Sequence, residues 1–366
     1  MASGTRSASL AADGLKVPSL SFPSPHGEEN ARKQCLVFFI PGNPGLADYY
    51  TPFLATLRQL LDETEKRTAT HAFHLYGQNL IGFEDADHEP FGGEVVPFGL
   101  ESQICHFYDR LKSMRIQQDG NPRKGTHFDE VIVMGHSVGA YITIEIFHRH
   151  HLQLQQRDAK AAELKLKSAI LLFPAVSHLA KSPSGQRLNM VRTTPFLDRN
   201  AHHIAKRFVD LWPESALNLF IRKALGFSPH AAAVTTRFLR SRDGIWQAIH
   251  LGKDELGTIT EERWSEELWE VAEDLKEEEE EAEAQGDRNT ARSVPKFFFY
   301  FGEDDHWVAN ECRDEFIEKR TAHNNRGSGR TRIVMDEDGI PHAFCINHSE
   351  VVAEKVKVWI DKIAGQ

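Results

Sequence analysis

The chain contains 366 residues, of which 43 are Lys or Arg and 53 are Asp or Glu, so its formal net charge at pH 7 is −10. This acidic balance disfavours nucleic-acid binding, because phosphate recognition depends on clustered basic residues. The four cysteines lack metal-ligand or redox spacing, which indicates free thiols in a reducing compartment. We expect no cofactor and no metal. The length allows one α/β domain with an insertion, or two modest domains.

Residues 1–34 are predicted to form a flexible N-terminal tail with at most one edge strand. The first part of this tail is rich in Ser, Ala, Gly and Pro and lacks the apolar core of a signal peptide. The chain also contains no run of about 18 apolar residues and no terminal lipidation signal. We therefore expect any membrane contact to be peripheral.

The first buried strand is predicted over Cys35–Ile40, an unbroken apolar run that ends in Pro41-Gly42-Asn43-Pro44-Gly45. Backbone N–H groups in such a loop can bind a developing oxyanion. Pro44 has no N–H, so the candidate donors are Gly42 and Asn43, and we favour Asn43. Taken alone, the segment is equally compatible with a glycine-rich turn that has no catalytic role.

The most informative segment is the run Val131-Ile132-Val133-Met134 followed by Gly135-His136-Ser137-Val138-Gly139 and a helical pattern over 140–147. A strand, a Gly-x-Ser-x-Gly turn and a helix together are typical of a nucleophile elbow, which exposes the serine hydroxyl on a tight turn. The two glycines allow the strand and the helix to approach closely. We predict Ser137 as the nucleophile and the Val138 N–H as the second oxyanion donor.

A large insertion is predicted between the strand over 168–173 and the next strand, which begins near Lys296. We assign residues 35–175 and 294–366 to one catalytic domain, and residues 176–293 to a helical cap with an acidic linker. The cap changes its charge along the chain. Residues 180–242 contain eleven Lys or Arg and three Asp or Glu, whereas residues 254–287 contain two basic and sixteen acidic residues.

The basic half of this cap contains candidate amphipathic helices over 208–227. Lys and Arg flank their large apolar side chains, and basic residues on one face with Trp, Phe and Leu on the other are typical of a helix that lies in a lipid interface. The alternative is that these side chains form the roof of the active site, and a lid can serve both roles. The candidate contact residues are Leu211, Trp212, Leu219 and Phe220.

An aromatic strand is predicted over Lys296–Phe301, and it opens into Gly302-Glu303-Asp304-Asp305-His306-Trp307. A serine nucleophile needs a general base, and the base needs an acid that orients it. We favour Asp305 over Asp304 as this acid, because the Gly-x-x-Asp spacing lets the chain turn back toward the base. Asp198 is a more remote alternative, since no strand closely precedes it.

The base is predicted in the loop after a short strand over Thr331–Met335. We favour His342 over His348, which lies beside the start of the closing helix, and over His323. The chain order Ser, Asp, His is that of the α/β-hydrolase fold. We therefore predict a mostly parallel central sheet with helices on both faces and a large helical cap inserted between late strands.

Four motifs together resemble the lipid-droplet-associated serine hydrolase family. They are the Pro-Gly-Asn-Pro-Gly loop with Tyr49-Tyr50 after it, Gly135-His136-Ser137-Val138-Gly139, Gly302-x-x-Asp305-His306-Trp307 and His342-Ala343-Phe344. The resemblance extends from about residue 36 to residue 363, apart from a divergent middle. It implies the nucleophile, acid and base roles for Ser137, Asp305 and His342.

The resemblance also implies a function. It implies hydrolysis of lipid esters, either acylglycerols or sterol esters, at the cytoplasmic face of lipid droplets, with the endoplasmic reticulum as a second location. The expected partners are the lipid ester and a lipid surface, not nucleic acid. A thioesterase or acyltransferase would use the same acyl-enzyme. The alternative outside enzymes is a droplet-surface interaction protein with a weak or vestigial triad.

Overall fold

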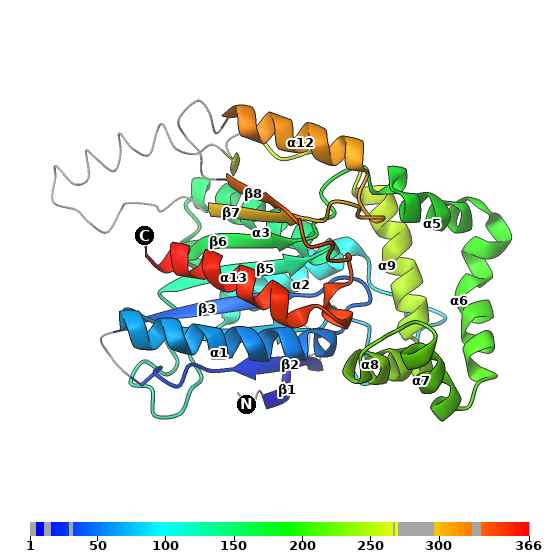
Figure 1. Cartoon of the computed structure of the whole chain (residues 1–366), viewed down its shortest axis with the longest axis horizontal. Helices are drawn as coiled ribbons and strands as arrows, with labels where there is room; N and C mark the ends of the chain where they lie inside the picture. The colour runs from blue at the N-terminus through cyan, green and yellow to red at the C-terminus, as the bar shows by residue number, and fades with distance from the viewer. Residues whose placement is uncertain are drawn as a thin grey trace.

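The centre of the molecule is an eight-stranded sheet (Figure 1). A computed structural model describes residues 5–10, 16–28, 32–265, 268–269, 296–323 and 331–365. The strands are β1 (Thr5–Leu10), β2 (Lys16–Phe22), β3 (Lys33–Ile40), β4 (His71–Gln78), β5 (Glu130–His136), β6 (Leu166–Leu172), β7 (Lys296–Phe301) and β8 (Thr331–Met335). Their order in the sheet is β1-β2-β4-β3-β5-β6-β7-β8. The strands from β3 to β8 are parallel, whereas β2 is antiparallel to both of its neighbours.

Helices cover both faces of this sheet (Figure 1). They are α1 (Thr51–Thr68), α2 (Leu100–Ser113), α3 (Val138–Gln155), α4 (Ala159–Glu163), α12 (Asn310–His323) and α13 (Ser349–Ala364), with short 3-10 turns η1 (Ala47–Tyr50), η2 (Leu179–Lys181) and η4 (Phe344–Ile346). Successive side chains of a strand point to opposite faces of the sheet, so β7 contacts a helix on each face. Phe299 lies 5.2 Å from the ring of Phe316 in α12, and Tyr300 lies 5.6 Å from the ring of Trp359 in α13.

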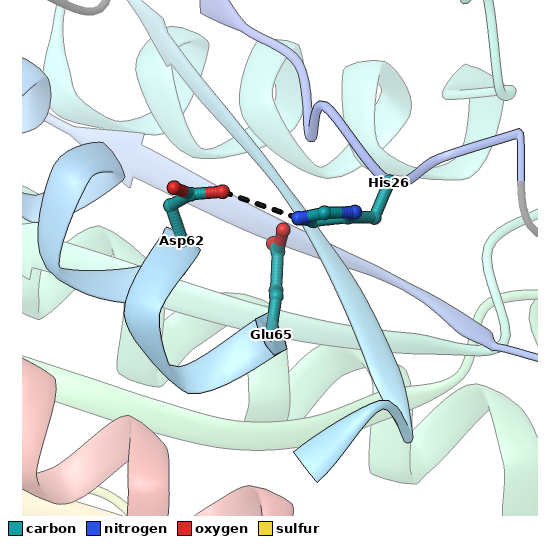
Figure 2. Close-up of side chains that lie close together, drawn as sticks. All are labelled: His26, Asp62 and Glu65. Atoms are coloured by element: carbon teal, nitrogen blue, oxygen red, sulfur yellow. Dashed lines mark ion pairs between the residues drawn. The ribbon is translucent and has the colours of Figure 1, made fainter. Parts of the chain in front are cut away.

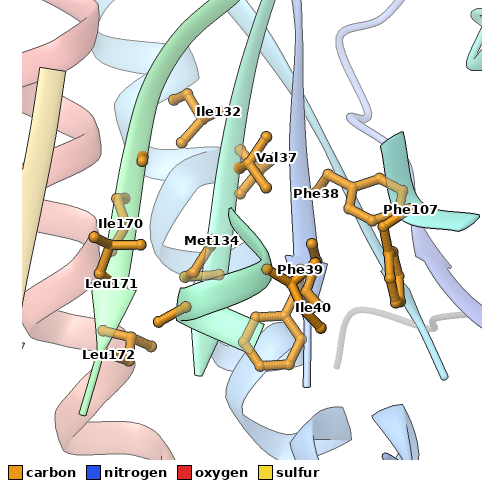
Figure 3. Close-up of a cluster of buried hydrophobic side chains, with 14 of the residues drawn as sticks. Val37, Phe38, Phe39, Ile40, Phe107, Ile132, Met134, Ile170, Leu171 and Leu172 are labelled. Carbon is orange, nitrogen blue, oxygen red and sulfur yellow. The ribbon is translucent and has the colours of Figure 1, made fainter. Parts of the chain in front are cut away.

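The hydrophobic core lies on both sides of β3, β5 and β6 (Figure 3). In β3, Phe38 contacts Phe107 of α2 with ring centroids 6.0 Å apart, and its neighbour Phe39 contacts Phe53 of α1 at 5.8 Å. Because both faces are covered, these strands are nearly continuous apolar runs rather than alternating ones. Truncating one of these buried rings to alanine costs roughly 3–5 kcal/mol, so the sheet is a rigid base for the loops at its edge.

The N-terminal segment differs from the expected flexible tail. Residues 5–10 and 16–22 form β1 and β2, and β2 pairs with the edge of β4. Val17, Leu20 and Phe22 are buried. The Ser- and Pro-rich composition obscured this strand, because its apolar residues are few and its stability depends on hydrogen bonds to a strand far along the chain.

The predicted helical insertion between late strands is confirmed. Helices α5 (Pro183–Thr193), α6 (Pro195–Asp210), α7 (Glu214–Lys223), α8 (Pro229–Arg240) and α9 (Gly244–Thr258) lie between β6 and β7. Figure 1 shows them gathered at the end of the sheet where the parallel strands finish. Most of the acidic linker lies outside the described residues.

The insertion has two parts with different attachments. The inner cap, α8 and α9, contacts the catalytic domain directly. Thr235 Oγ1 lies 2.8 Å from Tyr49 Oη, and the Gln247 side chain both donates to and accepts from the Phe98 backbone at 2.8 Å. In the outer cap, α5 to α7, helices α6 and α7 rest on a small satellite cluster formed by Val209, Leu217, Ile221, Ala232 and Ile245. Helix α5 instead binds the loop after β7, where the Ser184 N–H donates to the His306 carbonyl oxygen at 2.9 Å.

Candidate active site

Ser137 occupies a tight turn between β5 and α3. Its backbone angles, φ 55° and ψ −121°, are ones that residues other than glycine rarely adopt. Such a conformation costs on the order of 1–3 kcal/mol. A Cβ atom on Gly135 would lie 2.2 Å from the Gly139 carbonyl oxygen, and one on Gly139 would lie 2.3 Å from the Ile40 carbonyl oxygen. A side chain at either position would clash with the backbone, so the turn requires both glycines. The turn presents the Ser137 hydroxyl at the edge of the sheet.

His342 joins Ser137 to Asp305. Its Nδ1 lies 2.6 Å from Asp305 Oδ2, and its Nε2 lies 2.9 Å from Ser137 Oγ. The second oxygen of Asp305 accepts a hydrogen bond of 2.8 Å from the Trp307 N–H. With Nδ1–H donating to the carboxylate, Nε2 is free to accept the serine proton. The loops after β5, β7 and β8 thus converge at one edge, as expected for parallel strands.

The surroundings of this triad are apolar and largely closed to solvent. Asp305 is 4% exposed and His342 is 9% exposed. Burial alone would raise the pKa of Asp305, but the adjacent His342 ring and the Trp307 N–H outweigh it and hold this pKa below its usual value. Phe173 and Phe344 stack on each other beside the triad, and Phe173 also lies beside the His342 ring. A charge that develops here is therefore weakly screened.

The other candidates from the sequence lie elsewhere. Asp304 is exposed next to the buried Asp305. Asp198 lies in α6, where its carboxylate accepts from Lys253 Nζ at 2.9 Å. His348 immediately precedes α13, and His323 is the last residue of α12. The structure therefore brings Ser137 together with the favoured acid and base, not with their alternatives.

Two polar side chains that the sequence did not single out shape the loops of the triad. Arg313 of α12 donates to the backbone carbonyls of Gly302 and Glu303 at 2.8 and 2.7 Å, which fixes the loop that carries Asp305. The buried Asp336 accepts from the Ile340 N–H at 2.6 Å and from the Tyr300 hydroxyl, which fixes the loop that carries His342. Each loop is thus held close to the triad member that it bears.

His136, the first variable residue of the Gly-x-Ser-x-Gly motif, ties these loops together. Its Nε2 lies 2.9 Å from the His342 carbonyl oxygen, which can only accept, so Nε2 carries the proton. Its Nδ1 therefore accepts from the Tyr50 hydroxyl at 2.7 Å, and Tyr50 in turn accepts from the Gly42 N–H at 3.3 Å. Burial lowers the pKa of His136 to about 3, so the ring is neutral at physiological pH.

The loop after β3 lies directly beside the serine. A Cβ atom on Gly42 would lie 3.0 Å from Ser137 Cβ. Because Tyr50 accepts the Gly42 N–H, Asn43 remains the donor of the two candidates from the sequence. Val138 is the first residue of α3, and first-turn N–H groups have no partner within the helix. Both predicted oxyanion donors therefore belong to segments that border Ser137.

A second cluster of titratable groups lies away from this site. His26, Asp62 and Glu65 approach one another, with His26 Nε2 and Asp62 Oδ1 3.2 Å apart (Figure 2). Arg58 pairs with Glu65 at 2.7 Å, and Lys66 pairs with Asp62 at 2.6 Å. Because each carboxylate already has a basic partner, we assign this cluster the role of attaching the N-terminal segment to α1.

Comparison with known sequences gives one family. A family model described as lipid-droplet associated hydrolase matches residues 33–345. The lipid droplet-associated hydrolase of Gallus gallus is 26% identical over 335 residues, which cover 89% of this chain and 84% of the relative. The Rattus norvegicus protein of the same name is 25% identical over 331 residues, with coverage of 89% and 84%.

Comparison with solved structures confirms the predicted α/β-hydrolase fold. The peroxisomal alpha-beta-hydrolase Lpx1 from Saccharomyces cerevisiae aligns with a TM-score of 0.57 and 11% identity, covering 98% of this chain and 85% of its own. The juvenile hormone epoxide hydrolase from Bombyx mori aligns with a TM-score of 0.54 and 11% identity, with coverage of 96% and 74%. At this identity the likeness concerns the fold alone.

The neighbouring aspartates provide a matched pair of variants. We predict that Asp305→Asn lowers kcat/KM for a short-chain ester by about 10²–10⁴-fold, because His342 loses the group that orients it and offsets its positive charge. Asp304→Asn should lower it by less than about tenfold, because that carboxylate is exposed. Steady-state kinetics on both folded variants measure the difference. The opposite ranking would assign the acid role to Asp304.

Proposed function

The chain belongs to the lipid-droplet-associated hydrolase family, and from this premise we propose that it is a serine ester hydrolase that cleaves lipid esters, acylglycerols or sterol esters. Its membership confirms the resemblance inferred from the four motifs. The family and the α/β-hydrolase neighbours support hydrolase activity in general, without specifying the bond that is cleaved. The finer assignment rests on one observation, the placement of His342 between Ser137 Oγ and Asp305.

The proposed mechanism proceeds through an acyl-enzyme. Ser137 Oγ attacks the ester carbonyl carbon while His342 Nε2 accepts the hydroxyl proton, and the carbonyl electrons move onto oxygen. The tetrahedral intermediate collapses as His342 returns the proton to the leaving alcohol. Water, activated by His342, then attacks the acyl-Ser137 ester and releases the fatty acid. Asp305 stays ionised and stabilises the imidazolium in both halves.

The oxyanion would be held by the Val138 and Asn43 backbone N–H groups. Removing one such donor typically costs about 3 kcal/mol of transition-state stabilisation. The α3 N-terminus adds a favourable dipole at the same point, because it begins at Val138. The rings of Phe173 and Phe344 limit water near the reacting atoms, which strengthens these interactions.

The nucleophile is tested by Ser137→Ala. This variant should lose fluorophosphonate labelling and lose at least about 10³-fold in ester hydrolysis while keeping its fold, because the covalent route is removed. The assay compares an acylglycerol, a sterol ester and an acyl thioester, so that ester and thioester cleavage are separated. Equal turnover by wild type and variant would refute the serine-hydrolase mechanism, and thioester preference would favour a thioesterase.

We further propose that the outer cap is the surface that contacts lipid. Phe196, Ile204 and Phe208 of α6, together with Leu211 just after it, are 47–79% exposed. The exposed large hydrophobic residues Met190, Leu219, Phe220 and Leu225 lie on the neighbouring segments of the same cap. Trp212, which the sequence placed among the contact residues, is partly buried against the satellite cluster. This side chain therefore packs within the cap, and we leave it out of the proposed lipid contact.

The charges around this surface suit a phospholipid monolayer. Arg199, Arg207, Arg222 and Lys223 are exposed on the same helices. Basic side chains beside exposed aromatic and aliphatic residues are typical of helices that lie in a lipid interface. Among the described residues, no helix is long and apolar enough to cross a membrane. The exposed apolar and basic side chains of the outer cap support peripheral contact with a lipid droplet as the mode of attachment.

The lipid surface is tested by replacing Phe208, Leu211, Leu219 and Phe220 with Ser or Gln. Binding to artificial lipid droplets should weaken by at least about 100-fold, because burying apolar surface contributes about 25 cal/mol per Å². Hydrolysis of a soluble short-chain ester should stay within about threefold, since these side chains are exposed.

The matched control replaces four exposed valines that do not belong to the cap helices, Val95, Val96, Val351 and Val358, with Gln. This control should leave droplet binding unchanged. Unchanged binding of the cap variant would refute the outer cap as the contact surface. Loss of both droplet binding and soluble-ester hydrolysis would show that its four side chains serve folding instead.

A further inference from the structure

The cap helix α9 binds the side chain of Asn43 directly. Asn43 Nδ2 donates to the Ala248 carbonyl oxygen at 3.0 Å and to Glu255 Oε1 at 3.1 Å. These two acceptors lie more than 200 residues further along the chain. Together they use both hydrogens of the amide, which fixes the side chain in one orientation. Because the backbone of Asn43 follows Gly42 beside Ser137, the cap acts on the loop that borders the nucleophile.

We infer that Glu255 is a positioning residue of the oxyanion hole: with the Ala248 carbonyl, it holds the Asn43 side chain and thereby orients the Asn43 N–H toward the reacting carbonyl oxygen. The inference rests on the proposed function and extends it to a residue of the cap. It adds a role for the inner cap, which completes the catalytic geometry as well as covering it.

The position of α9 is itself fixed by the catalytic domain. Gln247 pairs with both backbone groups of Phe98, and Asp254 accepts from the Leu100 N–H at 2.7 Å. A Cβ atom on Gly252 would lie 2.9 Å from Leu188 Cδ2 and 3.6 Å from Asn43 Nδ2. Helix α9 therefore has little freedom to move beside the Asn43 loop. Its hydrogen bonds fix the Asn43 side chain and do not shift to follow it.

The protonation state of Glu255 fits this role. Burial raises the pKa of Glu255 to about 8, against the smaller opposing effect of the Asn43 hydrogen bond, and Asp254 on the same helix raises it further. The carboxyl group is thus mainly neutral at pH 7. In that form it orients Asn43 without placing a negative charge near the oxyanion, and ionisation at higher pH would oppose oxyanion formation.

Other charged groups surround this carboxyl from the neighbouring elements. The pair of Asp305 and His342 lies beyond Ser137 on the catalytic domain. From the outer cap, Arg192 approaches α9 at Gly257, where a Cβ atom would lie 3.8 Å from its guanidinium. The pH dependence of a variant that cannot ionise separates the contribution of Glu255 from that of the triad.

The test compares Glu255→Leu with Glu255→Gln on a soluble short-chain ester. Glu255→Leu should lower kcat by about 10- to 100-fold with KM changed less than about threefold, because an oxyanion contact forms only in the transition state. Glu255→Gln keeps an oxygen acceptor and should stay within about threefold of wild type at pH 7. Above pH 8 it should keep activity that the wild type loses, because it cannot ionise.

Binding of a trifluoromethyl ketone, which forms an oxyanion at the serine, should weaken in Glu255→Leu by about the same factor as kcat. Glu261→Leu, the same substitution at an exposed site just beyond α9, is the control and should match wild type. The inference is overturned if Glu255→Leu keeps kcat within about threefold, or if the leucine and glutamine variants lose the same activity together with thermal stability.

If Glu255→Leu does not fold, the activity of Glu255→Gln above pH 8 is the deciding measurement. A Glu255→Gln variant that loses activity above pH 8 as wild type does overturns the inference. The proposed function fails separately, when Ser137→Ala matches wild type in the same assay.

Discussion

The neutral His136 ring is the interaction on which the geometry of the site depends. One nitrogen donates to the backbone of His342, and the other accepts from Tyr50, which receives the Gly42 N–H. A single buried imidazole therefore sets the distance between the loop that carries the base and the loop that borders the serine. Protonation would turn the accepting nitrogen into a second donor and break the hydrogen bond from Tyr50. The geometry therefore depends on burial, which lowers the pKa of His136 and keeps the ring neutral.

The cap extends this arrangement outward in two steps. The inner cap is attached to the catalytic domain through specific polar contacts, including those of Gln247 and Asn43. The outer cap presents apolar side chains to the outside, and its helices α6 and α7 rest on the satellite cluster. The proposed lipid contact and the proposed support of the oxyanion hole therefore use different helices of one insertion. The outer cap contacts lipid, and α9 of the inner cap orients Asn43.

The fold and the triad could be predicted from the sequence because their signals are local. The elbow at Ser137 is a contiguous pattern, and the favoured acid Asp305 and base His342 each follow a recognisable strand. Some of the roles that the sequence missed depend on contacts between residues far apart in the chain. His136 and Glu255 contact partners 206 and 212 residues away, and β2 becomes a strand only because β4 offers it an edge. No pattern in a single sequence announces such pairings.

The small size of the satellite cluster has a consequence for motion. Val209, Leu217, Ile221, Ala232 and Ile245 form a contact far smaller than the core around β3 and β5. Segments with few buried apolar contacts open locally at low free energy, independently of global unfolding. Helices α6 and α7 can thus detach and reattach while α9 stays in place. Amide hydrogens of α6 and α7 would exchange with solvent well before those of the sheet, and a bound lipid surface would slow that exchange selectively.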